Sequence, residues 1–355
     1  AGFTLGHFPQ SFHFSTLGGW IAARSAGQFS DRYGKAEDFL AHAQMISPAG
    51  AWSTSEAPAS AAGPDLNGVI AGSEGTIGVI TDATVHIHPA PPVEKTYMFL
   101  FRHVAEGVHA VRQLRQDEQL PLAMLRLSDA EETRFLMRFR SGGASLGKTL
   151  FKAVLGLRGY TDRPALLLVG LTGAPGSVRR GTRRVMRHCR QAGGAFAGPR
   201  ADWRSGHYAM PYLRDDLMDR GIGVDTVETA TTWDNVLHLH QAVRRAAARH
   251  ATDAGYSCAT LAHISHSYPD GASLYFTFLF PMDLGHEIDQ WRALKRAVSD
   301  TIVSYGGTIS HHHGVGRDHQ PWMERELDEP ARSAIRAIQQ QLDPHGTCNP
   351  GKLVG

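Results

Sequence analysis

Three successive histidines, His311, His312 and His313, are the side chains of this sequence best suited to chemistry. They are internal and lead directly into the glycine turn 314–316. Imidazole titrates near physiological pH, so the cluster suits proton transfer or the binding of an anionic substrate. On an extended segment His311 and His313 share a face and His312 points away, and no cysteine or carboxylate lies nearby at ligand spacing. The pattern therefore disfavours a metal site.

A second candidate is the segment Gly72-Ser73-Glu74-Gly75-Thr76-Ile77-Gly78-Val79-Ile80, which is rich in glycine and hydroxyl groups. Such segments let backbone amides approach a flat or phosphorylated ligand closely. Plain turns would explain the glycines alone, but a similar string occurs at 14–20. Two such loops favour a cofactor cradle, although neither is a Walker loop or the dinucleotide glycine fingerprint.

Composition limits the classes of protein that fit. With 355 residues, 42% of them hydrophobic, the chain can bury a sizeable core and is expected to form two folding units. The net charge of +2 disfavours a protein whose main partner is nucleic acid. Cys189, Cys258 and Cys348 are too far apart for a disulfide framework or a zinc spacing, which favours a reducing, cytoplasmic compartment. No apolar run is long enough to span a bilayer, so we expect a protein that is at most peripheral to membranes.

The order of expected elements indicates an α+β protein. Residues 6–92 read as loops with short strands at 78–81 and 84–88, and the prolines at 89–92 mark a boundary. Beyond them Ser128 is expected to cap a helix that begins at Asp129, and Gly193-Gly194 to end another. We expect strands at 96–102, 123–127, 166–171, 258–267 and 272–280, and helices at 106–119, 177–191, 233–252 and 287–305. These elements divide the chain into 1–92, 93–305 and 306–355, the last read as loop and short helix.

Three further polar residues stand out in this part of the chain. Tyr275 alternates with Leu274 and Phe276, which is the pattern of a half-buried strand tyrosine. Arg126 lies among apolar neighbours, where an unpaired charge is costly. The guanidinium of Arg214 offers paired donors that suit a phosphate, but from the residues alone a surface ion pair with Asp215 or Asp216 is the favoured reading.

The motifs resemble a known family. The strings 6–20, 33–38, 72–81 and 310–316, with the spacing between them, are similar to the alkyldihydroxyacetonephosphate synthase branch of the vanillyl-alcohol-oxidase-type FAD-linked oxidases. The likeness covers nearly the whole chain, and the triple histidine narrows it to that branch. It implies a two-domain FAD-linked oxidase fold, with 1–92 as the second half of the flavin domain, 93–305 as an α+β cap with an antiparallel sheet, and 306–355 as a return toward the flavin.

The resemblance also implies FAD as the cofactor and assigns residues to it. The family's pyrophosphate loop would precede Ala1, so we expect the natural chain to begin earlier. The segments that match flavin-contacting loops comprise Gln10, Ser11, Phe12, His13, Phe14, Ser15 and Thr16; Ala23, Arg24, Ser25 and Ala26; and Glu74, Gly75, Thr76, Ile77, Gly78, Val79 and Ile80.

For the reaction, the resemblance implies exchange of the acyl group of acyl-dihydroxyacetone phosphate for a fatty alcohol, with flavin N5 as the covalent nucleophile. Tyr275 and the three histidines would move protons. A phenol can shuttle a proton if neighbouring cations lower its pKa, and we expect His311, His312 and His313 to be those cations. Arg214 would hold the substrate phosphate, and Arg126 matches another position important in the family. Two alternatives stay open: a 2-hydroxy-acid dehydrogenase or oxidase, in which Arg214 holds a carboxylate, and a non-catalytic fragment or partner of a separate flavin-binding chain.

One helix carries a basic cluster whose role the sequence leaves open. Its arginines form a solvated face, or a patch for an anionic lipid surface if a long-chain lipid is the substrate. A homodimer is an expectation from the family alone. The cluster consists of Arg179, Arg180, Arg183, Arg184, Arg187 and Arg190.

Overall fold

The computed structural model of the chain describes residues 2–139, 156, 159–160, 163–200, 208 and 212–354. The chain divides into two compact units. The terminal unit comprises Ala1–Ala90 and Ile302–Gly355, and the central unit comprises Pro91–Thr301. Among the described residues, no helix combines the length and the apolar character needed to cross a membrane.

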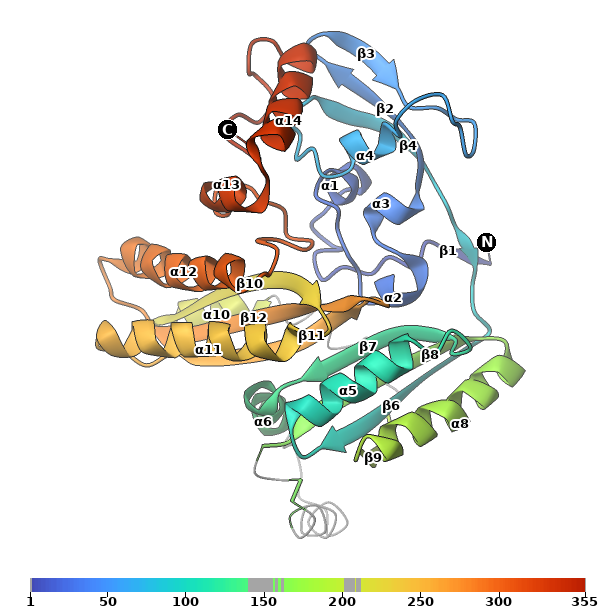
Figure 1. The fold of residues 1–355 in the computed structure, drawn as a ribbon, viewed down its shortest axis with the longest axis vertical. Coiled ribbons are helices and arrows are strands. Elements are labelled where there is room, and N and C mark those ends of the chain that lie inside the picture. The colour runs from blue at the N-terminus through green and yellow to red at the C-terminus, as the bar shows by residue number, and fades with distance from the viewer. Residues whose placement is uncertain are drawn as a thin grey trace. The chain divides into compact units, whose positions relative to one another are not determined.

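The terminal unit is built around a small antiparallel sheet of order β3-β2-β4 (Figure 1). Ile21, Met45 and Ile70 are fully buried and pack its core. The sheet consists of β2 (Leu40–Ser47), β3 (Gly50–Ser53) and β4 (Val79–Val85), and a separate pair is formed by β1 (Phe3–Thr4) and β5 (His88–Pro89). The helices are α1 (Leu17–Ala22), α2 (Ser30–Tyr33), α3 (Ala36–Phe39), α4 (Asn67–Ile70), η1 (Gln320–Trp322), α13 (Met323–Glu326) and α14 (Glu329–Leu342).

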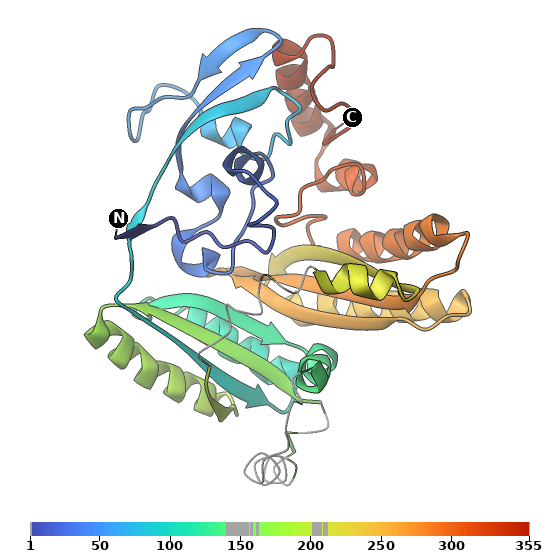
Figure 2. The ribbon, with the colours of Figure 1, turned by 180° about the vertical axis from the view of Figure 1, so that it is seen from behind.

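The central unit is a seven-stranded antiparallel sheet of order β10-β12-β11-β7-β8-β6-β9. Helices α5, α8 and α11 cover one face, and the view from behind shows the other face (Figures 1 and 2). The strands are β6 (Val93–Phe101), β7 (Leu122–Ser128), β8 (Ala165–Gly173), β9 (Ala195–Pro199), β10 (Ile222–Thr232), β11 (Ala259–Ser267) and β12 (Gly271–Pro281). The helices are α5 (Val104–Arg115), α6 (Ala130–Phe139), α8 (Pro175–Gln191), α10 (Tyr212–Met218), α11 (Val236–Asp253) and α12 (Glu287–Ser304).

This architecture confirms the predicted α+β class with an antiparallel sheet. The expected strands and helices of the central unit are present within a few residues of their predicted ends. The hairpin of β11 and β12 follows from the turn at Pro269-Asp270-Gly271, since the Tyr268 amide donates to the Gly271 carbonyl oxygen at 2.8 Å. As predicted, α8 ends before Gly193-Gly194, where the Gly194 amide donates to the Cys189 carbonyl at 2.7 Å.

Four local expectations were wrong. Ser128 does not cap α6: it is the last residue of β7, and the Asp129 carboxylate accepts the Glu132 amide at 2.9 Å. Residues 84–88 are not one strand, because β4 ends at Val85 and His88–Pro89 pairs with β1 at an edge that proline tolerates. Strand β10 was missed because its threonines and acidic residues lack an alternating apolar pattern. Residues 306–355 contain more than a short helix, since α14 runs for 14 residues behind the Asp328 cap.

Candidate active site

In the terminal unit, Glu74 joins four segments that are distant in sequence. Its own amide donates to the Ala22 carbonyl at 2.9 Å, and its carbonyl accepts Asn349 Nδ2 at 2.5 Å. Its carboxylate accepts the Val315 amide and, at 2.8 Å, the Gly316 amide. The 74–80 loop, the end of α1, the histidine loop and the closing 349–351 segment are therefore tied together at one residue.

Glycine is required where these segments approach closely. Gly72, Gly75 and Gly78 all have positive φ, and a Cβ at Gly78 would lie 2.5 Å from the Ile46 carbonyl oxygen. Glu74 also adopts positive φ, at 50°, without being glycine. A non-glycine residue in the left-handed region is held there by its surroundings, and here the contacts of its amide, carbonyl and carboxylate do so.

The segment 10–16 forms a largely exposed loop. Ser15 Oγ accepts Trp20 Nε1 at 2.6 Å and donates to the Ser11 carbonyl at 2.7 Å. The second string, which looked like a glycine loop, turns into helix α1 at Leu17, because Thr16 Oγ1 caps it by accepting the Gly19 amide at 3.1 Å.

The 23–26 segment follows α1 directly and contacts a buried histidine. Ser25 Oγ lies 3.2 Å from His7 Nε2, and Arg24, at φ 51°, packs beside the position that a Gly72 Cβ would occupy. Burial, and next the charge of His312, lowers the pKa of His7 to about 4. His7 is therefore neutral at physiological pH.

Residues in or next to the segments that match flavin-contacting loops fit a flat aromatic cofactor in two respects. The Ser73 hydroxyl and Gln28 Nε2 are buried without a hydrogen-bond partner among the described residues, although a buried polar group normally has one. Phe12 and Phe14 in the 10–16 loop are 43% and 69% exposed, which leaves aromatic surface available for stacking.

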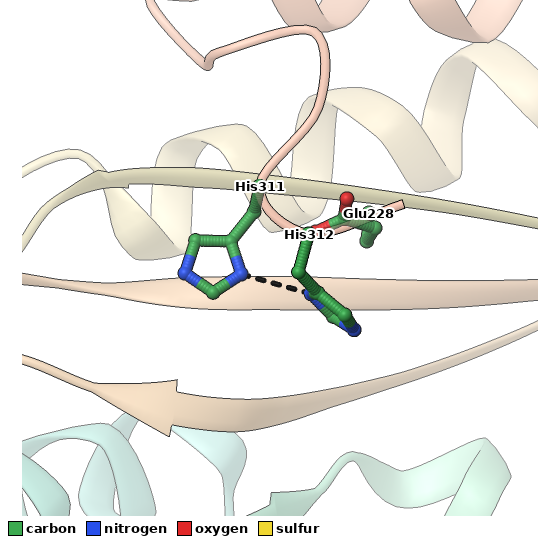
Figure 3. Close-up of side chains that lie close together, drawn as sticks. All are labelled: Glu228, His311 and His312. Carbon is green, nitrogen blue, oxygen red and sulfur yellow. Dashed lines mark hydrogen bonds between the residues drawn. The ribbon is translucent and has the colours of Figure 1, made fainter. Parts of the chain in front are cut away.

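The three histidines do not alternate as an extended segment would. Residues 311–313 form bends, and Nδ1 of His311 lies 2.9 Å from Nδ1 of His312 (Figure 3). The ring centroids of His312 and His313 are 4.7 Å apart. The two Nδ1 atoms are within hydrogen-bond distance, so one of them donates and the other accepts. Only one of the two Nδ1 atoms therefore carries a proton. Lys35 Nζ fixes the segment by donating to the His311 carbonyl at 2.9 Å.

In the central unit, Tyr275 lies in a row of polar residues across the sheet. On β12 it stands directly opposite Glu228 of β10 and His263 of β11, and His263 stands opposite Ser128 of β7. The predicted alternation is confirmed, since Leu274 and Phe276 are buried while Tyr275 is half-buried. Directly opposed residues share a face of the sheet, so these side chains gather on the face opposite to Phe276.

A buried ion cluster adjoins Tyr275. Arg126 Nη2 donates to Glu132 Oε1 at 2.9 Å, and His263 Nδ1 lies 2.9 Å from the same oxygen. The His263 ring stacks on the Tyr275 ring, with centroids 4.9 Å apart and planes 17° apart. The partner that Arg126 needed among its apolar neighbours is therefore Glu132, from the first turn of α6.

Burial raises the pKa of Tyr275 above its usual value of 10, and Glu228 and Asp225 add to the effect. A hydrogen bond with Thr226 and the charge of Arg126 act in the opposite direction. A neighbouring cation, Arg126, does lower this pKa as expected, but the net shift is upward because the cost of an anion at this buried position outweighs the pull of the arginine.

The remaining predicted residues are more exposed. Arg214 lies on α10 with an exposed side chain, so its role in substrate binding stays a prediction. On α8, Arg184 pairs with Asp117 through Nε at 2.7 Å and Nη2 at 2.8 Å. The other arginines of the basic cluster are exposed.

Two functional candidates, His263 and Glu132, were missed at the sequence level. Glu132 is 131 residues away from His263 in the chain, and only the pairing of β7 with β11 brings them together. The sequence did indicate that such a partner exists, because Arg126 lies among apolar neighbours and needs a compensating charge.

A small sheet with glycine-rich loops, joined in one chain to a unit with a seven-stranded antiparallel sheet, defines the class of the FAD-linked oxidases. Residues 90–353 match the family model "FAD linked oxidases, C-terminal domain", and residues 1–55 match "FAD binding domain". The chain belongs to the FAD-linked oxidase family, and its cofactor is FAD.

Within this family, the chain is similar to several individual proteins. The alkyldihydroxyacetonephosphate synthase of Dictyostelium discoideum is 34% identical, over 99% of this chain and 59% of that protein. A solved alkyldihydroxyacetonephosphate synthase superposes with a TM-score of 0.80 at 31% identity, over 99% of this chain and 61% of that one. The glycolate oxidase subunit GlcD of Bacillus subtilis is 25% identical, over 97% of this chain and 69% of that protein. The chain thus spans about six tenths of the length of the synthases that it matches.

Proposed function

We propose that this chain carries the catalytic part of an enzyme that exchanges the acyl group of an acyl-dihydroxyacetone phosphate for a fatty alcohol. The observation that carries the proposal is the synthase likeness over 99% of the chain, which includes the histidine loop and the strand of Tyr275. When bound, FAD supplies the covalent nucleophile of such an exchange.

Tyr275 acts in this proposal as a proton donor. Because its pKa is raised, the phenol keeps its proton at neutral pH and can give it to a departing carboxylate oxygen. The same phenolic oxygen can then take the proton of the incoming alcohol, so no net proton is consumed. The pair of His311 and His312, whose Nδ1 atoms lie 2.9 Å apart, is proposed to take part in proton transfer as well.

Arg214 is proposed to bind the substrate phosphate. Its exposed guanidinium is available for paired hydrogen bonds with phosphate oxygens. A flexible, exposed arginine suits a substrate that must enter and leave in every turnover. The exposed arginines of α8 are proposed to contact an anionic lipid surface from which a long-chain substrate could be taken.

The test uses the full chain after titration with FAD, followed by flavin absorbance. We expect label from a radioactive fatty alcohol to enter the ether product and the flavin to show no net reduction once turnover is complete. A protein that takes up no FAD would favour the reading as a partner of a separate flavin-binding chain and would contradict the proposal.

A second candidate function is oxidation of a 2-hydroxy acid, which the similarity to the glycolate oxidase subunit favours. In that case Arg214 would hold a carboxylate, and a histidine would accept the hydroxyl proton. Bleaching of the flavin by D-lactate or 2-hydroxyglutarate, without any incorporation of the alcohol, would select this function over the exchange reaction.

A further inference from the structure

Glu132 is placed by the start of α6. The Asp129 carboxylate accepts the Glu132 amide at 2.9 Å, and Asp129 is itself held by Arg244 Nη1 at 2.5 Å and His240 Nε2 at 3.2 Å from α11. The side chains of Asp129 and Glu132 are 3% and 8% exposed. The start of α6, and with it the backbone of Glu132, is thus fixed by contacts with α11.

The hydrogen bonds define the tautomer of His263. Burial alone would raise the pKa of Glu132, but His263 and Arg126 hold it far below its usual value, so the group is ionised. A carboxylate only accepts hydrogen bonds, and therefore His263 Nδ1 carries the proton at 2.9 Å from Oε1. Arg126 Nη2, at 3.4 Å from the same Nδ1, then cannot donate to it.

The imidazole held in this way is neutral. Burial, and next the charge of Arg126, lowers the pKa of His263, whereas Glu132 acts in the opposite direction. A neutral ring therefore lies against the Tyr275 ring, at 4.9 Å between centroids. The stack and the strand pairing leave the phenol little freedom to rotate.

Arg126 is a cation that acts on the phenol. It favours the phenolate, and Glu132 lies 2.9 Å from its Nη2 and cancels that charge. Among the described residues, the titratable and charged groups around Tyr275 include Asp225 and Glu228 on β10, His263 on β11 and Arg126 on β7. Glu132 on α6 pairs with Arg126, and Lys295 on α12 pairs with Asp225 at 3.2 Å.

We propose that Glu132 and His263 are positioning residues for Tyr275: Glu132 neutralises Arg126 and fixes His263 as the Nδ1–H tautomer, and the stacked imidazole holds the phenol with its hydroxyl proton in place. This inference rests on the proposed role of Tyr275 in proton transfer. The cluster thus determines the pH at which the phenol loses its proton, as well as its orientation.

A cluster of the same composition elsewhere in the unit provides the matched control. Asp117 accepts Arg184 Nε at 2.7 Å and pairs with His188 Nε2 at 2.9 Å, and its side chain is 6% exposed. It joins the segment that follows α5 to α8 and lies outside the Tyr275 row. A merely structural role for a buried carboxylate, arginine and histidine would give the same result in both clusters.

The test follows ionisation of Tyr275 by its ultraviolet absorbance, taken as the difference between each protein and the same protein with Tyr275→Phe. In Glu132→Gln the uncompensated Arg126 should shift the titration of the phenol about one pH unit lower, which is about a tenfold rise in phenolate at a given pH. Asp117→Asn should titrate like the wild type, and Glu132→Asp, which keeps the charge, should restore most of the wild-type curve.

The result that would overturn the inference is a Glu132→Gln titration that coincides with the wild type, or an equal shift in Asp117→Asn. If Glu132→Gln does not fold, the double variant Arg126→Gln with Glu132→Gln buries no charge in the pair. Its phenol should titrate at or above the wild-type pH, and a lower value would contradict the inference.

The titration tests the positioning role independently of the proposed function, because it requires no turnover of substrate. If the exchange reaction is absent but the titration shifts as expected, only the proposed function fails. If exchange occurs and the titration does not respond, only the positioning role fails.

Discussion

In the terminal unit one residue, Glu74, ties loops together mainly through backbone groups, whereas in the central unit side chains from two strands and a helix form the cluster beside Tyr275. The first arrangement depends on local conformation, because glycines at positive φ let the segments approach. The second depends on burial of charge, because Glu132 and Arg126 must compensate each other out of water. The two units should therefore respond differently to substitution and to pH.

The largest effect is expected from loss of one charge in the central unit. Arg126→Met leaves Glu132 as a buried anion and should lower the free energy of unfolding by about 3–5 kcal/mol. Adding Glu132→Leu should recover most of that loss, since no charge then remains unpaired. Urea denaturation of both variants measures the difference, and a double variant no more stable than Arg126→Met would contradict the reason given. Arg184→Met in the Asp117 cluster, where the arginine is 32% exposed, should cost less.

In the terminal unit, Glu74→Ala removes the acceptor of the Val315 and Gly316 amides and should cost about 3 kcal/mol, with weaker FAD binding. Glu74→Gly loses the same bonds but accepts the φ of 50° without strain, so it should be more stable than Glu74→Ala by about 1 kcal/mol. Thermal unfolding and flavin fluorescence titration measure both effects. Equal stability of the two variants would mean that backbone conformation contributes little here.

The buried His7 should make the stability of the terminal unit depend on pH. The unfolded chain takes up this proton near pH 6.5 and the folded chain near pH 4, so stability should fall as the pH drops through that window, by about 3 kcal/mol in total. His7→Gln should remove this part of the slope in urea denaturation at several pH values. The exposed His345 serves as the control, and a slope unchanged by His7→Gln would refute the assignment.

The smallest effect is expected at a surface cap. Asp328→Ala removes the acceptor of the Ala331 amide at the start of α14 and should cost about 1 kcal/mol. Flavin affinity should not change, because the cap lies outside the four segments joined by Glu74. A marked loss of flavin binding in this variant would show that the terminal unit is held together less locally than its contacts indicate.

The same difference explains which features of the structure could be predicted from the sequence. Glycine loops, the α8 stop and the β11–β12 hairpin were predictable because each depends on neighbouring residues. The family motifs likewise identified the fold and the cofactor. The partners of Arg126 and Tyr275 were not predictable, since His263 and Glu132 meet only after β7 pairs with β11. For the same reason the net rise in the pKa of Tyr275 was not predicted, because burial, its largest cause, is a property of the folded sheet.

The central claim is that Tyr275 is the proton donor of a flavin-dependent exchange. The most direct measurement is incorporation of labelled fatty alcohol into the ether product by the FAD-loaded chain, compared between Tyr275→Phe and Tyr97→Phe. Tyr97 is a matched tyrosine on β6 whose hydroxyl lies 2.9 Å from Thr182 Oγ1. We predict that Tyr275→Phe binds FAD normally but loses at least about a hundredfold in exchange rate, whereas Tyr97→Phe retains it. Equal exchange by both variants would contradict the account.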